Sequence, residues 1–424
     1  MPLPDGTSLP PPAGDPRGPA WVLDPAVTFL NHGSFGACPR EVLEAQARWR
    51  DRMEAEPVAF LARDLDEFLA EARVELARFL GAAPDDLAFV PNASAGVNTV
   101  LRSLRFAPGD ELLALDHAYN ASLNALRFAA ARDGARVVVA RVPFPLEDAG
   151  AVVDAVCRAV NPRTRLALVD HVTSPTGLVL PVARIVAELA TRGIDTLVDG
   201  AHAPGMVPLD LPELGAAYYT GNCHKWLCAP KGSAFLHVRR DRQQQIRPLA
   251  ISHGANSARS DTSRYRLEFD WTGTFDPTPW LCLPHALRVV PTGVPGGWAG
   301  LMAANRRLAL EARDLLAHVL GVEHAAPDAM IGAMAAIRLP GTRRLVRDLA
   351  AAAARLEAAI VARGFEAPIV AWPPPWLVAS GDLAPSAAGD LYVRVSAQRY
   401  NRIEQYERLA DVLREILAAA TEGA

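Results

Sequence analysis

The segment "TGNCHKWLCAP", residues 220–230, places Lys225 between a histidine and a tryptophan in a run that otherwise looks buried. The chain has 43 lysines and arginines; Lys225 and Lys231 are the lysines, and the other 41 are arginines. A buried lysine is costly unless its amine is paired or used chemically, and unlike arginine it can lose its proton. We therefore predict that Lys225 is a reactive amine, whereas Lys231, before a glycine in "APKGS", is typical of a turn.

Around this segment, short apolar runs alternate with helical stretches from about residue 86 to 240. Seven runs predict strands, at residues 86–90, 111–116, 136–142, 165–172, 196–201, 216–222 and 232–238. This alternation predicts an α/β fold with a mixed, mainly parallel sheet that is covered on both faces. In such sheets ligands bind beyond the carboxyl ends of the strands.

The rest of the chain predicts two helical segments before the sheet and a second domain after it. The helices are expected at about residues 40–55 and 63–80. Beyond about residue 285, long Ala/Arg/Leu helices and the strand "DLYVRVSA" indicate a smaller C-terminal α+β domain. We expect a loose proline-rich tail at 1–20, a large cofactor-binding domain with an N-terminal segment at 21–285, and a small domain at 286–424.

Composition points to a globular enzyme and away from several other classes of protein. The formal net charge is −4 with dispersed basic residues, which argues against nucleic-acid or membrane-surface partners. No apolar run is long enough to span a bilayer, and the N-terminus lacks a secretory signal pattern. The five cysteines form no CxxC pair and no metal-ligand spacing. We expect a cytoplasmic protein with free thiols and no metal.

Polar residues at predicted strand ends indicate a cofactor. In "TLVDGAHAPG", Asp199 ends one strand, and Lys225 follows another strand 26 residues later. Pyridoxal phosphate needs this pair: the lysine forms a Schiff base, and the aspartate keeps the pyridine nitrogen protonated. Upstream, "FVPNASAGVNTVL" leads from a strand into a helix whose first turn can bind a phosphate group. The order of phosphate turn, aspartate and lysine predicts pyridoxal phosphate as the cofactor.

With these motifs in place, the chain resembles the class V group of fold-type I pyridoxal-phosphate enzymes, through "LVDGAHAPG" and "TGNCHKW". The isopenicillin N epimerase-like branch is the most similar, through "FLNHGSFGACPREV", "HVTSPTGLVLPV", "WTGTFD" and "YVRVSAQRYN". The resemblance runs from about residue 21 to near the C-terminus. It implies the fold-type I architecture and a homodimer with the cofactor at the subunit interface.

The resemblance also implies cofactor contacts. Lys225 would carry the cofactor and Asp199 would pair with its ring nitrogen. The phosphate would be held by five residues: Ala93, Ser94, Ala95, Asn222 and His224. The remaining contacts would be Ser174 and His202 near the ring hydroxyl, His117 or Tyr119 on the ring face, and Thr274 reaching the phosphate of a second subunit.

On the substrate side, the resemblance implies that Arg394 binds the α-carboxylate of an amino acid, a group that matches a guanidinium fork. Asn31 and His32 of "LNHGSFG" would line this side of the site. The small-molecule substrate is then an amino acid.

The reaction that the branch implies is epimerisation at the α-carbon of an L-α-amino acid or of a substrate with an aminoadipyl-like side chain. Elimination from a cysteine S-conjugate by a C–S lyase, and transamination by a class V aminotransferase, remain alternatives, because all three begin with removal of the α-proton. A cysteine desulfurase mechanism is disfavoured because no cysteine follows Cys282. A cofactor-binding regulator without catalysis is disfavoured by the intact set of Lys225, Asp199 and Arg394.

Overall fold

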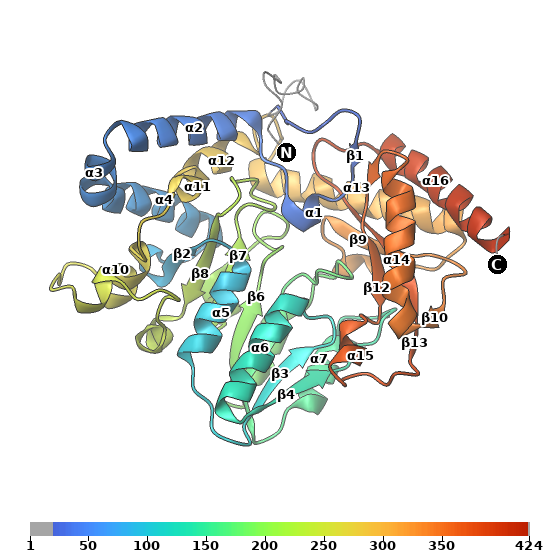
Figure 1. Cartoon of the computed structure of the whole chain (residues 1–424), viewed down its shortest axis with the longest axis horizontal. Helices are drawn as coiled ribbons and strands as arrows, with labels where there is room; N and C mark the ends of the chain where they lie inside the picture. The colour runs from blue at the N-terminus through green and yellow to red at the C-terminus, as the bar shows by residue number, and fades with distance from the viewer. Residues whose placement is uncertain (1–19, 423–424) are drawn as a thin grey trace.

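The computed structural model describes residues 20–422, so the predicted tail at 1–20 lies almost wholly outside the described residues (Figure 1). The centre is a seven-stranded sheet with strand order β2-β8-β7-β6-β5-β3-β4. Its strands are β2 (Leu87–Val90), β3 (Glu111–Leu115), β4 (Arg136–Ala140), β5 (Thr164–Asp170), β6 (Asp195–Asp199), β7 (Tyr218–Asn222) and β8 (Ala234–Val238). Strand β8 runs antiparallel to both neighbours, and the other neighbouring pairs are parallel. The predicted mixed, mainly parallel sheet is confirmed.

Helices cover both faces of this sheet. On one face lie α5 (Ala93–Ser103) and α6 (Asn120–Asp133), in front of the sheet in Figure 1, and on the other lie α7 (Gly150–Ala159) and α8 (Val182–Ala190). Successive residues of β3 therefore enter different cores: Leu112 packs with α5 and α6, and Leu113 packs with α7 and α8. Apart from the edge strand β4, which is partly exposed, burial on both sides explains why the strands read as continuous apolar runs.

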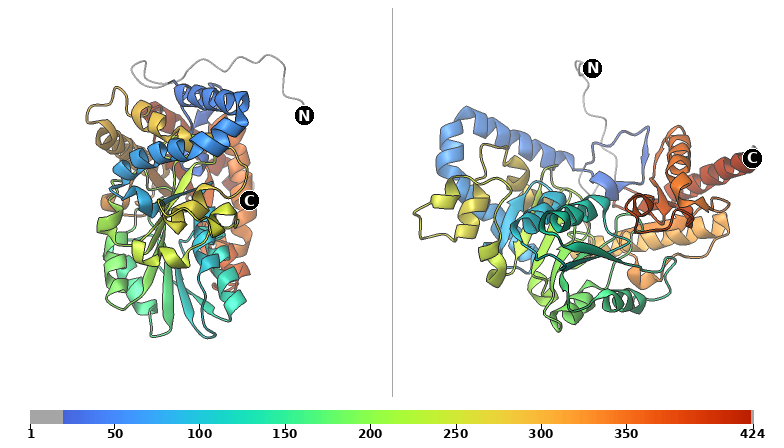
Figure 2. Two further views of the ribbon diagram at one scale, coloured as in Figure 1. Left: turned by 90° about the vertical axis from the view of Figure 1, so that its left-hand side faces the viewer. Right: turned by 60° about the horizontal axis from the view of Figure 1, so that its bottom comes forward.

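Further helices lie at the two ends of the sheet. Figure 2 shows the N-terminal helices in blue at one end and the C-terminal part in orange and red at the other. The predicted helical segments are confirmed as α2 (Arg40–Ala55) and α4 (Leu65–Leu80). Shorter helices are α1 (His32–Phe35), α3 (Pro57–Ala59), α9 (Leu211–Leu214), α10 (Arg264–Asp270), α11 (Thr278–Leu281) and α12 (Leu283–Val289). Within residues 20–422, no helix combines the length and apolar character that a membrane crossing requires.

The C-terminal part has its own antiparallel sheet. Its central strand β13 (Ala388–Ser396) pairs with β9 (Met334–Arg338), β10 (Arg344–Leu345) and β12 (Ile369–Trp372). Its helices are α13 (Gly297–Leu320), α14 (Val346–Val361), α15 (Trp376–Ala379) and α16 (Ile403–Glu422). Near the N-terminus, β1 (Thr28–Phe29) pairs with β11 (Phe365–Glu366), so this segment joins the C-terminal part. The division at residue 285 stays a prediction.

The amino end of β3 is anchored by a buried carboxylate. Glu111 accepts hydrogen bonds from Arg136 at 2.5 Å, from Arg163 at 2.8 Å and from Asn161 at 2.6 Å. Burial alone would raise the pKa of Glu111, but these three partners outweigh it and lower the pKa to about 2. The ionised carboxylate thus ties β3 to β4 and to the loop before β5.

Candidate active site

A cavity of about 280 Å³ opens at the carboxyl ends of the central strands. Its walls come from α1, the start of α5, and the loops after β3, β5, β6 and β7. The lining residues are Ser34, Phe35, Asn92, Ala93, Ser94, Tyr119, Asp170, Val172, Ser174, Asp199, Ala201, His202, Asn222, His224 and Lys225. The cavity therefore brings together most of the residues that the sequence analysis assigned to the cofactor.

Lys225 follows β7 and points its amine into this cavity. Its Nζ lies 3.2 Å from Nε2 of His202, which comes from the loop after β6. Burial lowers the pKa of Lys225 to about 7, with a further lowering by the nearby Arg394 and an opposing effect of Asp199. Part of the population therefore carries a neutral amine at neutral pH, which a nucleophile and a base both require.

The backbone of Lys225 is held from behind by His32 of α1. His32 is fully buried; its Nε2 lies 3.0 Å from the Lys225 carbonyl oxygen, and its Nδ1 lies 2.8 Å from the Tyr400 hydroxyl. Nδ1 also accepts the Ala37 amide at 3.3 Å, so Nε2 is the nitrogen that donates. The structure thus places His32 behind the lysine. The sequence analysis had instead expected His32 to line the cavity.

Gly36 makes this close approach possible. It ends α1 with a positive φ of 71°, and a Cβ at this position would come within 2.9 Å of the Lys225 Cα. Positive φ and the absence of a side chain both favour glycine here. Neither Gly36 nor Tyr400 was assigned a role from the sequence, because the contacts join segments that are far apart in the chain.

Asp199 is the last residue of β6 and lines the cavity. It is 3% exposed, and it accepts hydrogen bonds from the Ser122 hydroxyl at 2.7 Å and from the Ala201 amide at 3.1 Å. Burial raises the pKa of Asp199, while the two donors and the charge of Lys225 act to lower it. Ser122, on α6, is a contact that the sequence analysis missed.

The predicted phosphate end of the site differs in detail from expectation. The Ala93 amide donates to Asn222 Oδ1 at 2.8 Å, and the Ala95 amide donates to Asn92 Oδ1 at 2.8 Å. Both predicted amides therefore already have protein partners. The sequence analysis did not anticipate this, because the sequence gives no sign that two asparagine side chains cap this turn. Ser94, Asn222 and His224 line this end of the cavity.

The structure separates the two aromatic candidates for the ring face. His117 is buried with Nδ1 at 2.8 Å from the Thr176 hydroxyl and with its ring centroid 4.0 Å from that of Trp372, outside the cavity. Tyr119 lines the cavity, and its side chain is partly open to solvent, with 44% of the residue exposed. Of the two, Tyr119 is the side chain that can contact a ligand there.

Arg394 lies on β13 directly behind the cavity wall. It is 4% exposed, and its guanidinium donates to the Ser174 carbonyl, to the Ser34 hydroxyl at 2.9 Å and to Asn31 Oδ1 at 3.2 Å. Burial lowers the pKa of Arg394 to about 10, so it remains a cation at neutral pH. Ser34 and Ser174 line the cavity, whereas Asn31 supports the arginine from outside it.

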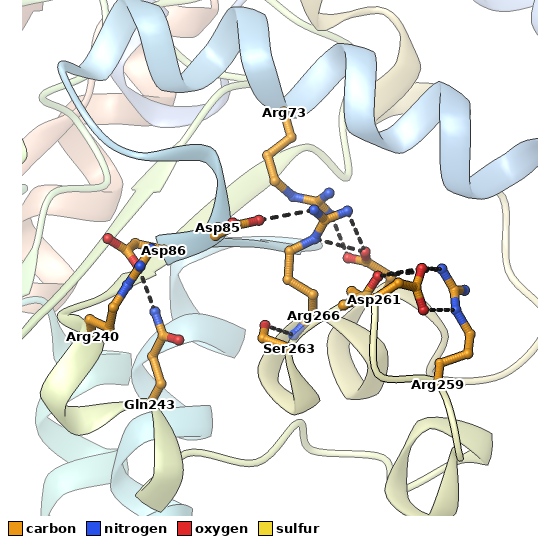
Figure 3. A network of polar contacts seen from close by, with 11 residues as sticks. Arg73, Asp85, Asp86, Arg240, Gln243, Arg259, Asp261, Ser263 and Arg266 are labelled. Atoms are coloured by element: carbon orange, nitrogen blue, oxygen red, sulfur yellow. Dashed lines mark hydrogen bonds and ion pairs between the residues drawn. The ribbon is translucent and has the colours of Figure 1, made fainter.

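Thr274 does not line this chain's cavity and is exposed. It follows α10, which charged contacts fix against α4 and the loop before β2 (Figure 3). The buried Arg73 of α4 pairs with Asp270, which also bonds Arg266 at 3.2 Å, and Arg266 reaches Asp85 at 3.1 Å. These contacts hold the helix before Thr274, and Thr274 itself lies at the surface, outside the lining of its own chain's cavity.

The side chains around the cavity fit pyridoxal phosphate. They supply an amine, a buried carboxylate on the neighbouring strand, and polar groups beside a helix N-terminus. Two buried histidine nitrogens at the cavity, His202 Nδ1 and His224 Nδ1, have no hydrogen-bond partner among the described residues. Such atoms are rare in a complete site, and a polar ligand can satisfy them.

Comparisons with known proteins agree with this chemistry. A sequence profile of the class V aminotransferase family matches residues 32–333. Isopenicillin N epimerase of Streptomyces clavuligerus is 36% identical over 407 residues, covering 92% of this chain and 95% of that protein. Putative L-cysteine desulfhydrase 1 of Oryza sativa subsp. japonica is 32% identical over 412 residues, covering 92% and 83%. A solved structure of the cystine C–S lyase C-DES, with glycine covalently linked to its pyridoxal phosphate, shares the fold with a TM-score of 0.74 at 20% identity, covering 91% of this chain and 96% of that chain.

Proposed function

We propose that this chain, which belongs to the pyridoxal-phosphate-dependent class V aminotransferase family, is an amino-acid epimerase. The proposal rests on one observation above all: Lys225, Asp199 and Arg394 surround or adjoin a single cavity. The similarity to isopenicillin N epimerase supports the choice of reaction. The substrate would be an L-α-amino acid or a compound with an aminoadipyl-like side chain.

Pyridoxal phosphate, when bound at Lys225, supplies an electron sink that makes the α-hydrogen of an amino acid acidic. The amine of Lys225 would remove that proton and hold it at Nζ, which its pKa of about 7 favours near neutral pH. The Arg394 guanidinium would bind the α-carboxylate and so fix the direction of the Cα–H bond. Asp199 would pair with the ring nitrogen and keep it protonated.

Epimerisation also needs a proton donor on the side opposite the lysine. We propose the Tyr119 hydroxyl for this role, because it lines the cavity and comes from the start of α6, while Lys225 follows β7. A tyrosine hydroxyl can both donate and accept a proton. Elimination would not need this second group, since Lys225 alone can move the proton.

A C–S lyase is the second candidate, favoured by the similarity to an L-cysteine desulfhydrase. In that reaction the α-proton is lost and a sulfur substituent leaves the β-carbon. No cysteine lines the cavity among residues 20–422, which gives no support to a route through a protein persulfide. Transamination remains the third possibility within the family.

We further propose a cytoplasmic homodimer in which Thr274 of each chain reaches the cofactor phosphate of the other. Its support is the exposed position of Thr274 away from its own cavity. The five cysteines are free thiols, which suits a reducing compartment.

The test is to incubate candidate amino acids with the enzyme in deuterated water and to follow the α-proton by NMR, with chiral analysis and assays for pyruvate and ammonia. Exchange with inversion and no keto acid supports the epimerase. Release of pyruvate and ammonia would instead identify a lyase, and a keto acid that forms only with an amino acceptor would identify an aminotransferase. Lys225→Ala should abolish exchange, whereas Lys231→Ala, which removes the other lysine, should retain it.

A further inference from the structure

A second buried carboxylate, Asp170, lies beside Asp199 and is not explained by the cofactor assignments. Asp170 ends β5 and Asp199 ends β6, and the two are direct partners in the parallel ladder. Both are 3% exposed, and both line the cavity. Side chains in register on adjacent strands point to the same side of the sheet, so two acids meet in a site with little water.

The two carboxyl groups have unequal support. Asp199 accepts two hydrogen bonds, and the charge of Lys225 also acts to lower its pKa. Asp170 accepts the Tyr119 amide on Oδ1 at 3.2 Å, and its buried Oδ2 has no partner in the described part of the chain. A buried charge with so few donors is unfavourable next to a like charge. Asp170 is therefore the member of the pair that should hold a proton.

The titratable groups around Asp170 do not offset this effect. Asp199 and His202 come from the end of β6, Lys225 from the end of β7, and His171 follows Asp170 itself. His171 and His202 have pKa values lowered by burial and stay neutral. Burial, and next the charge of Asp199, raise the pKa of Asp170 well above its ordinary value.

We propose that Asp170 is a positioning residue that works as a neutral acid: its Oδ1 holds the backbone of Tyr119 at the cavity wall, and its proton leaves Asp199 as the ionised member of the pair. One residue would then connect Tyr119, the proposed proton donor, with Asp199, the proposed partner of the ring nitrogen. This inference rests on the proposed function in assigning Tyr119 as the proton donor and Asp199 as the partner of the cofactor ring nitrogen. It does not depend on which reaction follows removal of the α-proton.

The experiment compares the wild-type holoenzyme with Asp170→Asn and Asp170→Ala. Asparagine is a neutral shape match whose Oδ1 can still accept the Tyr119 amide, whereas alanine leaves that buried amide without a partner. Infrared difference spectra at pH 7, wild type minus Asp170→Asn, should show a protonated carboxyl band. Equilibrium dialysis with pyridoxal phosphate should give a dissociation constant within about twofold of wild type for asparagine and raised about tenfold for alanine.

Two results would overturn the inference. If the difference spectrum shows a carboxylate band and no carboxylic-acid band, Asp170 is ionised. If asparagine weakens cofactor binding as much as alanine does, the charge of Asp170 and not its hydrogen bond is what matters. The infrared result is separate from catalysis, so an enzyme that proves to be a lyase, or shows no turnover, leaves this test intact.

Discussion

Arg394→Ala should strongly reduce kcat/KM for α-proton exchange while leaving the cofactor bound. The guanidinium is buried behind Ser34 and Ser174, and a bound α-carboxylate would receive two charge-assisted hydrogen bonds from it. At about 1.5 kcal/mol for each bond, the loss is about 3 kcal/mol, or roughly a hundredfold in kcat/KM for α-proton exchange. Arg394→Lys keeps the charge without the planar fork and should lose roughly tenfold.

The assay measures exchange in deuterated water for an amino acid and for the matching amine that lacks the carboxylate. Arg338→Ala, which removes a 42% exposed arginine from β9 of the same sheet, is the matched control and should not change kcat/KM. Visible absorbance of the cofactor reports whether Arg394→Ala still holds it. If the amino acid keeps its full exchange rate in that variant, or if the amine loses as much as the amino acid, the carboxylate role is refuted.

Three further changes test other parts of the structure. Tyr119→Phe should retain α-proton exchange but lose inversion by roughly a hundredfold, measured by NMR and chiral chromatography; equal loss of both would contradict a proton role. Gly36→Ala forces a Cβ against the Lys225 backbone, and it should lower the free energy of unfolding by about 2 kcal/mol and weaken cofactor binding in dialysis. If both values match those of the wild type, the contact is not tight. Glu111→Gln should lower the free energy of unfolding by about 2 kcal/mol at pH 7, as measured by denaturant titration. Because the folded pKa lies near 2, below the ordinary 4.5, this difference should shrink as pH falls from 4.5 toward 2; a constant difference would refute the ionic anchor.

Most of the large sheet could be predicted because its strands, apart from β4 at one edge, are buried on both faces. Each strand then appears in the sequence as an apolar run, and helical segments separate most of the successive runs. The seven predicted runs coincide with β2 to β8. The pairing of β1 with β11 could not be predicted, because each strand is two residues long and the two are more than three hundred residues apart. No local periodicity marks such a contact.

The candidate site divides in the same way. Lys225 and Asp199 could be proposed from the sequence because each combines an unusual residue type with a position at or just after the end of an apolar strand. The roles of Ser122 and Asn92 depend on hydrogen bonds that tertiary packing creates, and those of Asp170 and His32 depend on burial. Sequence patterns report side-chain type and local order, and they do not report which atoms face one another across the fold.

The most direct test of the whole account is the identity of the lysine that carries the cofactor. Purified protein should be yellow, and reduction with borohydride followed by peptide mapping should place the pyridoxyl label on Lys225. Lys231→Ala should keep both the colour and the label, since that lysine is exposed and does not line the cavity. Label on Lys231, or a colourless protein that takes up no label, would contradict the account.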